Sequence, residues 1–221
     1  MLDSAFPVLM AAAAYLVGSI PFPLLIGLRK GVDVRRVGSG NIGAGNLTRT
    51  VGWPAGLAAA LLDGYKGLLP FVVAPVAALG TGAATTAGLA AVAGHNWSLF
   101  LRGRGGRGLA TSTGVVLGLN PALALWPAAW ALVGWKVGGG IGGFMGWGLL
   151  PVYAAVGSFS GVETSAACGL ALLMIARRAQ GDDERAPGFR AALQRVVFDC
   201  RELGGGDPAG AGRDAKRPAR A

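Results

Sequence analysis

The sequence predicts an all-α integral membrane protein, a polytopic bundle of seven, alternatively five, transmembrane helices. Of its 221 residues, 52% are hydrophobic and 14% are charged, whereas a soluble domain usually carries about 25% charged residues. About 20 apolar residues suffice to cross the hydrocarbon core as a helix. Stretches of 25 or more residues without Asp, Glu, Lys or Arg occupy residues 4–28, 67–101, 108–135 and 137–162. Lys and Arg give a net charge of +9 but lie in short clusters between these stretches, a pattern that indicates membrane orientation rather than nucleic-acid binding.

The first apolar stretch, residues 4–28, predicts a retained transmembrane helix. Only Asp3 carries a charge before it, so the basic segment that opens a signal peptide is missing, and Arg29 and Lys30 close it.

The positions of Lys and Arg predict the topology. They collect in residues 29–49, in residues 102–107 and after Arg177, and the positive-inside rule makes all three regions cytoplasmic. One span therefore precedes the first region, and an even number separates each region from the next. Two spans fit residues 53–79 and 82–101, whereas residues 108–176 hold two long spans or four shorter ones. The amino terminus is then outside and the carboxyl terminus cytoplasmic.

We expect three parts along the chain. Residues 1–177 form the transmembrane domain. Residues 178–203 form a cytoplasmic tail with an amphipathic surface helix, because apolar residues recur at three- and four-residue steps from Phe189 to Leu203. Residues 204–221 are rich in Gly, Pro and Ala and are expected to be disordered.

The first cytoplasmic loop has the composition of a phosphate-binding segment. Gly38, Gly40 and Gly43 match G-x-G-x-x-G, but they follow an arginine pair and a membrane span instead of a buried strand, so a dinucleotide site is weakly supported. Glycines nevertheless let successive backbone N–H groups turn toward one anion. Neutral donors and arginines surround them: Ser39, Asn41, Asn46, Arg35 and Arg49. The alternative is a flexible loop whose arginines only orient the protein.

The second loop repeats this chemistry. Arg102, Arg104 and Arg107 are separated almost only by glycine, so several guanidinium groups can reach one anion. Two such loops on one face indicate two phosphorylated groups or one large one. His95, the only histidine, precedes them and is either a catalytic residue or a hydrogen-bonded residue at the membrane boundary.

Asp63 and Lys66 form an intramembrane polar pair, three residues apart on the second span. Ionisable groups at such depth indicate function, although a structural ion pair between helices explains them equally well. No motif with metal-ligand spacing occurs, so we expect neither a metal site nor a cofactor, and no Ser-His-Asp triad is evident.

Together these motifs resemble the bacterial acyl-phosphate:glycerol-3-phosphate acyltransferases, multi-pass enzymes of seven spans in the cytoplasmic (inner) membrane. The likeness runs from about Tyr15 to Gly118. The segments that carry it are Gly18-Ser19-Ile20-Pro21, the loop from Gly38 to Arg49, Asp63 with Lys66-Gly67, and Gly94-His95 followed by Gly105-Gly106-Arg107-Gly108. This family transfers a fatty acyl group from acyl phosphate to the 1-hydroxyl of glycerol 3-phosphate, giving lysophosphatidic acid and phosphate, the first step of phospholipid synthesis.

The resemblance also implies roles for particular residues. Ser39, Asn41, Asn46 and Arg49 line the polar site, and His95 and Arg107 complete it. An acyl phosphate is already activated, so the enzyme needs positioning and electrostatic stabilisation more than a covalent nucleophile. We expect direct attack by the glycerol hydroxyl, with Arg49 and Arg107 holding phosphates and the proton passing to His95 or to a substrate phosphate oxygen. A small transporter or channel for an anionic solute is the alternative function.

The chain also departs from the family pattern. Gly45 replaces a Thr, Trp97-Ser98 replaces Phe-Pro, and Arg104 and Arg107 replace Lys. The third family motif, His-Arg followed by Asn and later Glu, is replaced by Arg177-Arg178-Ala179-Gln180. Arginine keeps an anion-binding charge but hardly exchanges a proton, so Arg104 and Arg107 are expected to clamp substrates.

Overall fold

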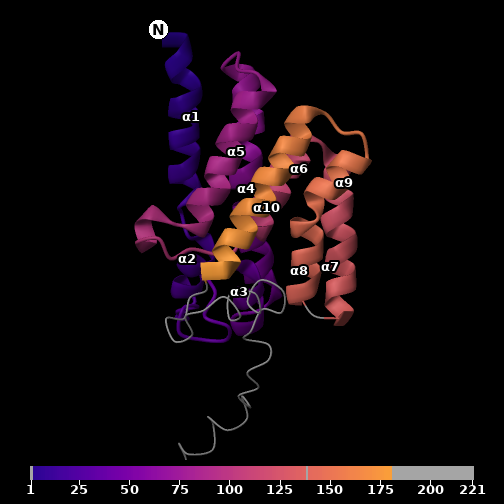
Figure 1. Ribbon diagram of the computed structural model, residues 1–221. Helices are drawn as coiled ribbons and strands as arrows, with labels where there is room; N and C mark the ends of the chain where they lie inside the picture. The colour runs from indigo at the N-terminus through magenta and orange to yellow at the C-terminus, as the bar shows by residue number, and fades with distance from the viewer. Residues whose placement is uncertain (1, 138, 181–221) are drawn as a thin grey trace, which may run out of the picture.

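A computed structural model describes residues 2–137 and 139–180, and every regular element among them is helical (Figure 1). The predicted all-α fold is therefore confirmed. The amino terminus lies at one end of the bundle and the last described helix ends toward the other (Figure 1).

The first predicted span is broken into two helices. α1 (Leu2–Gly18) and α2 (Phe22–Arg29) flank the segment Ser19-Ile20-Pro21. Proline has no N–H to donate, so Pro21 and Pro23 interrupt the helical hydrogen-bond ladder here and leave carbonyl groups of the preceding turn for other donors. Ala5–Arg29 is nevertheless long and apolar enough to cross a membrane.

The next three helices form part of the lower end of the bundle, cross to the upper end and come back. The short α3 (Ala44–Thr50) precedes the 24-residue α4 (Trp53–Val76), which also has the length and composition of a membrane span. α5 (Thr81–Asn96) comes back down (Figure 1). It ends before residue 101, the predicted limit, because Ser98 Oγ donates to the Ser19 carbonyl (2.5 Å) and the chain turns into η1 (Leu99–Leu101).

The described elements of the second half are α6 (Leu109–Leu119), η2 (Pro121–Ala124), α7 (Leu125–Val137), α8 (Gly139–Gly148), α9 (Leu150–Val156) and α10 (Gly161–Gln180). Of these, α6, α7, the pair α8–α9 and α10 run in alternating directions (Figure 1). The surface helix and the disordered tail that the sequence predicts after α10 lie outside the described residues.

Glycines bring these helices into backbone contact. A Cβ atom at Gly67 of α4 would collide with the carbonyl oxygen of Thr111 on α6, and one at Gly114 of α6 would collide with that of Gly64 on α4. Gly94 of α5 meets the Tyr15 carbonyl of α1 in the same way. Small residues allow this close approach in lipid, where van der Waals packing holds helices together.

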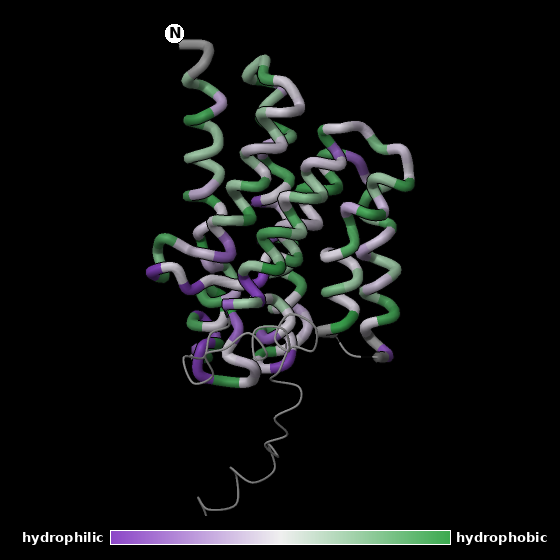
Figure 2. The backbone as a smooth tube through the Cα atoms, viewed as in Figure 1, coloured by the Kyte–Doolittle hydropathy of each residue, from purple (hydrophilic) through white to green (hydrophobic). Residues whose placement is uncertain are grey.

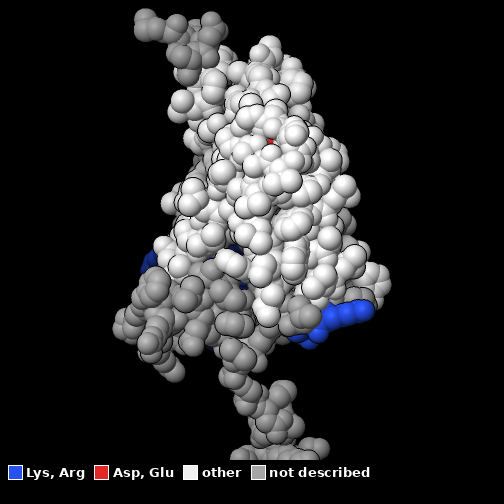
Figure 3. Space-filling model, turned by 45° about the vertical axis from the view of Figure 1, so that its right-hand side comes forward, with Lys and Arg blue, Asp and Glu red and all other residues white. Residues whose placement is uncertain are grey.

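Hydrophilic residues gather at the lower end of the backbone trace (Figure 2), and the described surface in Figure 3 is almost free of charged side chains above that end. Large apolar side chains point outward, among them Leu61, Val76, Leu132 and Leu172, which are 65–89% exposed. On the face in Figure 3, Lys and Arg appear only at the lower end. Such an apolar exterior is typical of a protein surrounded by lipid.

Candidate active site

The two glycine- and arginine-containing loops meet at the lower end of the bundle. Leu101 of η1 packs against a cluster that includes Val34 and Ile42 of the first loop and Leu47 of α3. At Gly106 of the second loop, an added Cβ would lie 2.7 Å from the Ile42 carbonyl oxygen. The two segments, about 60 residues apart in sequence, therefore form one surface.

Asn46 organises the first loop from within. Its Nδ2 donates to the carbonyls of Val34 (2.8 Å) and Val37 (3.1 Å), and its Oδ1 accepts from the backbone N–H of Ser39 (3.0 Å). The side chain is buried at the start of α3. Gly38 has a φ of +58°, and a Cβ there would collide with Asn46 Oδ1. In this structure the Asn46 amide shapes the loop that was expected to hold substrate.

Ser39 and Asn41 of the first loop are both half-buried. Ser39 Oγ accepts from the backbone N–H of Asn41 at 3.4 Å. Asn41 Oδ1 is buried and makes no hydrogen bond within the described part of the chain. These two side chains retain hydrogen-bonding capacity for a ligand.

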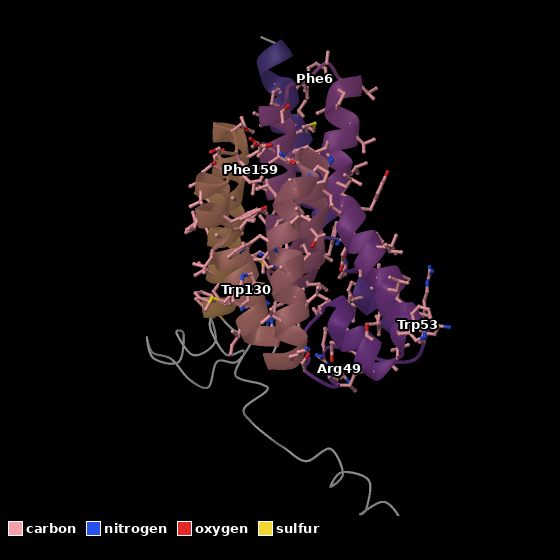
Figure 4. The ribbon with its side chains drawn as sticks, turned by 90° about the vertical axis from the view of Figure 1, so that its right-hand side faces the viewer. Phe6, Arg49, Trp53, Trp130 and Phe159 are labelled. Carbon is pink, nitrogen blue, oxygen red and sulfur yellow. The ribbon has the colours of Figure 1, made fainter. Side chains whose placement is uncertain are left out.

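The arginines of the first loop differ in their surroundings. Arg35 forms a two-pronged contact with Asp33, through Nε (2.9 Å) and Nη2 (2.8 Å), and this contact lowers the pKa of the Asp33 carboxyl to about 2. Arg49 is exposed in the last turn of α3 and makes no ion pair with any described residue. Figure 4 places Arg49 and Trp53 at the end opposite Phe6 and Phe159. Arg49 is therefore available to an anion, whereas Arg35 already has a partner.

The second loop lies directly against the end of α5. Gly106 donates its N–H to the carbonyl oxygen of His95 (3.0 Å), and a Cβ at Gly105 would collide with the same carbonyl. Gly108, with φ at +72°, is the N-cap residue of α6. Arg104 is exposed and Arg107 is half-buried in this segment.

His95 is buried at the centre of this arrangement. Its Nδ1 lies 3.6 Å from Asp63 Oδ1 on α4, and its Nε2 lies beside Gly106, where an added Cβ would collide with it. His95 therefore contacts both α4 and the second loop.

Asp63 and Lys66 form an ion pair of 2.7 Å, and both side chains are almost completely buried. Lys66 Nζ also donates to the carbonyls of Gly18 (3.0 Å) and Ile20 (2.6 Å) at the break between α1 and α2. The ammonium lies 5.0 Å from the centre of the Phe22 ring. The pair thus joins α4 to the broken first span.

Arg177, to which the sequence assigned no role in the site, also contacts the second loop. Arg177, near the end of α10, donates from Nε to the Gly106 carbonyl (3.1 Å) and from Nη2 to the Gly105 carbonyl (2.9 Å). Arg177 and its neighbour Arg178 are only 6% and 7% exposed. The available signal was their place at the end of the last span, on the side where the charge pattern also put the second loop.

These groups suit the binding of phosphorylated molecules. Among residues 2–137 and 139–180, no three His, Cys, Asp or Glu side chains come close enough to hold a metal ion. Arginines, loop amides and a buried imidazole instead offer positive charge, hydrogen-bond donors and a proton acceptor in one place.

Comparisons with known proteins give the family. The family model of glycerol-3-phosphate acyltransferase matches residues 8–181. The chain is 51% identical over 113 residues to a glycerol-3-phosphate acyltransferase of Thermus thermophilus; this match covers 51% of the chain and 57% of the relative's length. It is 42% identical over 183 residues to glycerol-3-phosphate acyltransferase 4 of Dehalococcoides mccartyi, covering 79% of each protein.

Solved structures agree with the sequence comparisons. The crystal structure of PlsY (YgiH), an integral membrane glycerol 3-phosphate acyltransferase, superimposes in its glycerol 3-phosphate form with a TM-score of 0.72 and 30% identity, covering 89% of this chain and 98% of that one. Its lysophosphatidic acid form superimposes with a TM-score of 0.70 and 32% identity, covering 79% of this chain and 88% of that one. The chain is therefore a helical membrane protein, and because the family model matches most of its length, it belongs to the glycerol-3-phosphate acyltransferase family.

Proposed function

We propose that this protein transfers a fatty acyl group from acyl phosphate to the 1-hydroxyl of glycerol 3-phosphate, giving lysophosphatidic acid and inorganic phosphate. The observation that carries the proposal is the contact between the two glycine- and arginine-containing loops, with buried His95 beside Gly106. A relative with 30% identity and the same fold is described with glycerol 3-phosphate bound.

The charge of the site fits these substrates. Both carry a phosphate, and Arg49 and Arg107 belong to the two segments that meet. A guanidinium offers a planar set of donors that matches phosphate oxygens. Ser39 and Asn41 supply neutral hydrogen bonds nearby, and exposed Arg104 adds positive potential at the rim, which attracts anions from solution.

The chemistry requires one nucleophilic substitution. The 1-hydroxyl oxygen of glycerol 3-phosphate attacks the carbonyl carbon of the acyl phosphate, a new C–O ester bond forms, and the bond from that carbon to the phosphate oxygen breaks. The hydroxyl proton passes to His95 Nε2 or to a phosphate oxygen of the substrate. No covalent acyl-enzyme is needed, because phosphate is a good leaving group and the site's task is to align the two substrates.

We further propose a topology of seven crossings in the bacterial inner membrane, with the amino terminus outside and the site at the cytoplasmic end. The alternating directions of α6, α7, α8–α9 and α10 support four crossings after residue 108 (Figure 1). The basic side chains at the lower end support its cytoplasmic placement.

A direct assay tests the proposed reaction. Purified protein in detergent micelles is mixed with palmitoyl phosphate and glycerol 3-phosphate, and lysophosphatidic acid and phosphate are measured. We expect equal amounts of both products. Parallel reactions with palmitoyl-CoA identify the donor, and protein-containing liposomes loaded with buffer test for uptake of glycerol 3-phosphate. Uptake without acylation, or acylation from the thioester alone, would overturn the proposal.

A further inference from the structure

Three ionisable side chains lie buried together where α4, α5 and the break between α1 and α2 meet. Asp63 and Lys66 come from α4 and His95 from α5, and each is at most 8% exposed. The same carboxylate oxygen, Asp63 Oδ1, lies 2.7 Å from Lys66 Nζ and 3.6 Å from His95 Nδ1. A buried charge must be paired, so this geometry constrains all three residues.

Lys66 is held by contacts with its own helix and with the break between α1 and α2. An ammonium group has three N–H bonds, and Lys66 Nζ has three close oxygen neighbours: Asp63 Oδ1, the Gly18 carbonyl (3.0 Å) and the Ile20 carbonyl (2.6 Å). It therefore closes the break between α1 and α2. Asp63 differs from Lys66 in that a carboxylate can accept several hydrogen bonds at once. Besides Lys66, its other charged or titratable neighbour is His95.

The orientation of the imidazole follows from this contact. With Nδ1 toward Asp63, the opposite nitrogen Nε2 lies beside Gly106 in the second loop, and no described residue forms a hydrogen bond with Nε2. In a neutral imidazole one nitrogen carries the proton and the other accepts one. A carboxylate beside Nδ1 favours the proton there, which leaves the lone pair on Nε2.

We propose that Asp63 is a positioning residue, which fixes His95 in the tautomer that carries its proton on Nδ1 and presents an unprotonated Nε2 to the second loop. Its consequence for catalysis rests on the proposed function, because Nε2 is then the atom able to take the proton of the glycerol hydroxyl. The tautomer itself is a property of the protein alone.

The single histidine allows a test without any activity measurement. The chain is produced with 15N-labelled histidine and a histidine-free affinity tag, and 15N NMR is recorded in micelles at a pH where the ring is neutral. Only His95 gives imidazole signals. We expect the pyridine-type signal on Nε2 and the protonated type on Nδ1. A wild-type spectrum with the proton on Nε2 would overturn the proposal.

Two variants separate positioning from charge neutralisation. Asp63→Asn removes the carboxylate from both neighbours, and we expect the Nδ1-protonated tautomer to lose its dominance. Lys66→Met is the matched control: it breaks the same ion pair and destabilises the fold, but it leaves Asp63 beside His95, so the tautomer should stay unchanged. Two results would contradict the proposal: Lys66→Met alters the tautomer as much as Asp63→Asn does, or neither variant alters it. In either case Asp63 serves only to neutralise Lys66.

A double-mutant cycle tests the catalytic consequence. Asp63→Asn should lower kcat by about tenfold or more with KM for glycerol 3-phosphate little changed, since general bases contribute about 100-fold or more to rates. Asp63→Glu should recover part of the loss. In a His95→Ala background, Asp63→Asn should lower kcat no further, because it acts through the imidazole. If the double variant instead loses kcat by the product of the two single-variant factors, Asp63 acts independently of His95 and the positioning role is contradicted. A wild type without acyl transfer would refute the proposed function and leave the NMR result to decide on Asp63.

Discussion

At the residue scale, Gly106 shows how tightly the second loop fits its surroundings. From the sequence, a glycine at this position is expected to let the backbone approach an anion closely. The structure adds a second reason, because His95 Nε2 and the Ile42 carbonyl occupy the space that a side chain would need. Even one methyl group would displace the imidazole or the loop.

Gly106→Ala should therefore reduce kcat/KM by about 100-fold or more, since a misplacement of about 1 Å costs rates on that scale. Gly82→Ala, where a Cβ meets nothing within 4 Å, is the matched control and should leave activity unchanged. Steady-state kinetics of both purified variants measure the effect. Wild-type activity in Gly106→Ala would show that the loop does not touch the reacting groups.

Arg35 and Arg49 of the first loop should differ in importance. Arg49→Ala is expected to lower kcat/KM for glycerol 3-phosphate by about tenfold or more, because a charge-assisted hydrogen bond to phosphate contributes about 1.5–3 kcal/mol. Arg35→Ala should cost less than about threefold, because Asp33 already engages that guanidinium. The same assay with varied glycerol 3-phosphate compares them. A larger loss for Arg35→Ala would mean that substrate displaces Asp33.

The difference in activity between Arg49→Ala and Arg35→Ala should not depend on pH near neutrality. The Asp33 pKa is lowered from 3.8 to about 2 in the folded protein, so the carboxylate stays ionised and its stabilising contact is complete above about pH 4. The contact is lost only as the pH falls through about 2. The ratio of the two variants' kcat/KM, measured between pH 6 and 8, roughly the neutral range, should therefore be constant.

Residue types could be predicted from the sequence better than their tasks. Glycine-rich composition and arginines identified both loops, but Asn46 was expected to bind substrate, and the structure commits its amide to Val34, Val37 and Ser39. That assignment depends on the positive φ of Gly38, which brings the chain back over Asn46. Such a fold of the loop has no counterpart in residue spacing.

At the element scale, α10 supports the second loop through Arg177. A trans peptide unit points its C=O and N–H in opposite directions. By drawing the Gly105 and Gly106 carbonyls toward α10, Arg177 turns the N–H groups of Gly106 and Arg107 away from it. The orientation of the loop's donors therefore depends on a side chain about 70 residues further along the chain.

Arg177→Ala should lower kcat/KM by about tenfold or more and destabilise the protein by about 2 kcal/mol, because two buried carbonyls lose their donors. Arg177→Lys, which keeps the charge but loses the planar pair of donors, should give an intermediate loss. Kinetics and thermal unfolding in the same detergent measure both. Full activity in Arg177→Ala would show that the loop holds its shape without α10.

Element boundaries were predictable only where chemistry changes abruptly along the chain. α4 runs from Trp53 to Val76, close to the predicted span 53–79. α5 stops at Asn96 because Ser98 bonds to the broken first span, a contact that joins residues 79 positions apart. The helix α3 lies within the predicted loop and is too short for hydrophobic periodicity to reveal.

At the scale of the whole molecule, charge clusters and parity predicted the basic end and an odd number of crossings, but they left five and seven open. The reason is the composition of residues 108–176, where Gly and Pro divide apolar sequence into helices such as the 11-residue α6 and the 10-residue α8. Apolar length alone does not distinguish one long span from two short helices that pack side by side.

Cysteine labelling distinguishes the two topologies. In a Cys168→Ser/Cys200→Ser background, Lys136→Cys at the end of α7 should react with a membrane-impermeant maleimide only from the cytoplasmic side, and Ser158→Cys, between α9 and α10, only from the outside. Intact cells and inverted vesicles provide the two sides. Labelling of Lys136→Cys from outside is the result that five crossings predict.

The most direct test of the account is equilibrium binding of glycerol 3-phosphate to purified protein, because its central claim is that two distant loops form one phosphate site. We expect saturable binding to the wild type, binding weaker by about tenfold or more in both Arg49→Ala and Arg107→Ala, and unchanged binding in Arg36→Ala, whose exposed guanidinium serves as the control. Wild-type affinity in either of the first two variants would contradict the claim.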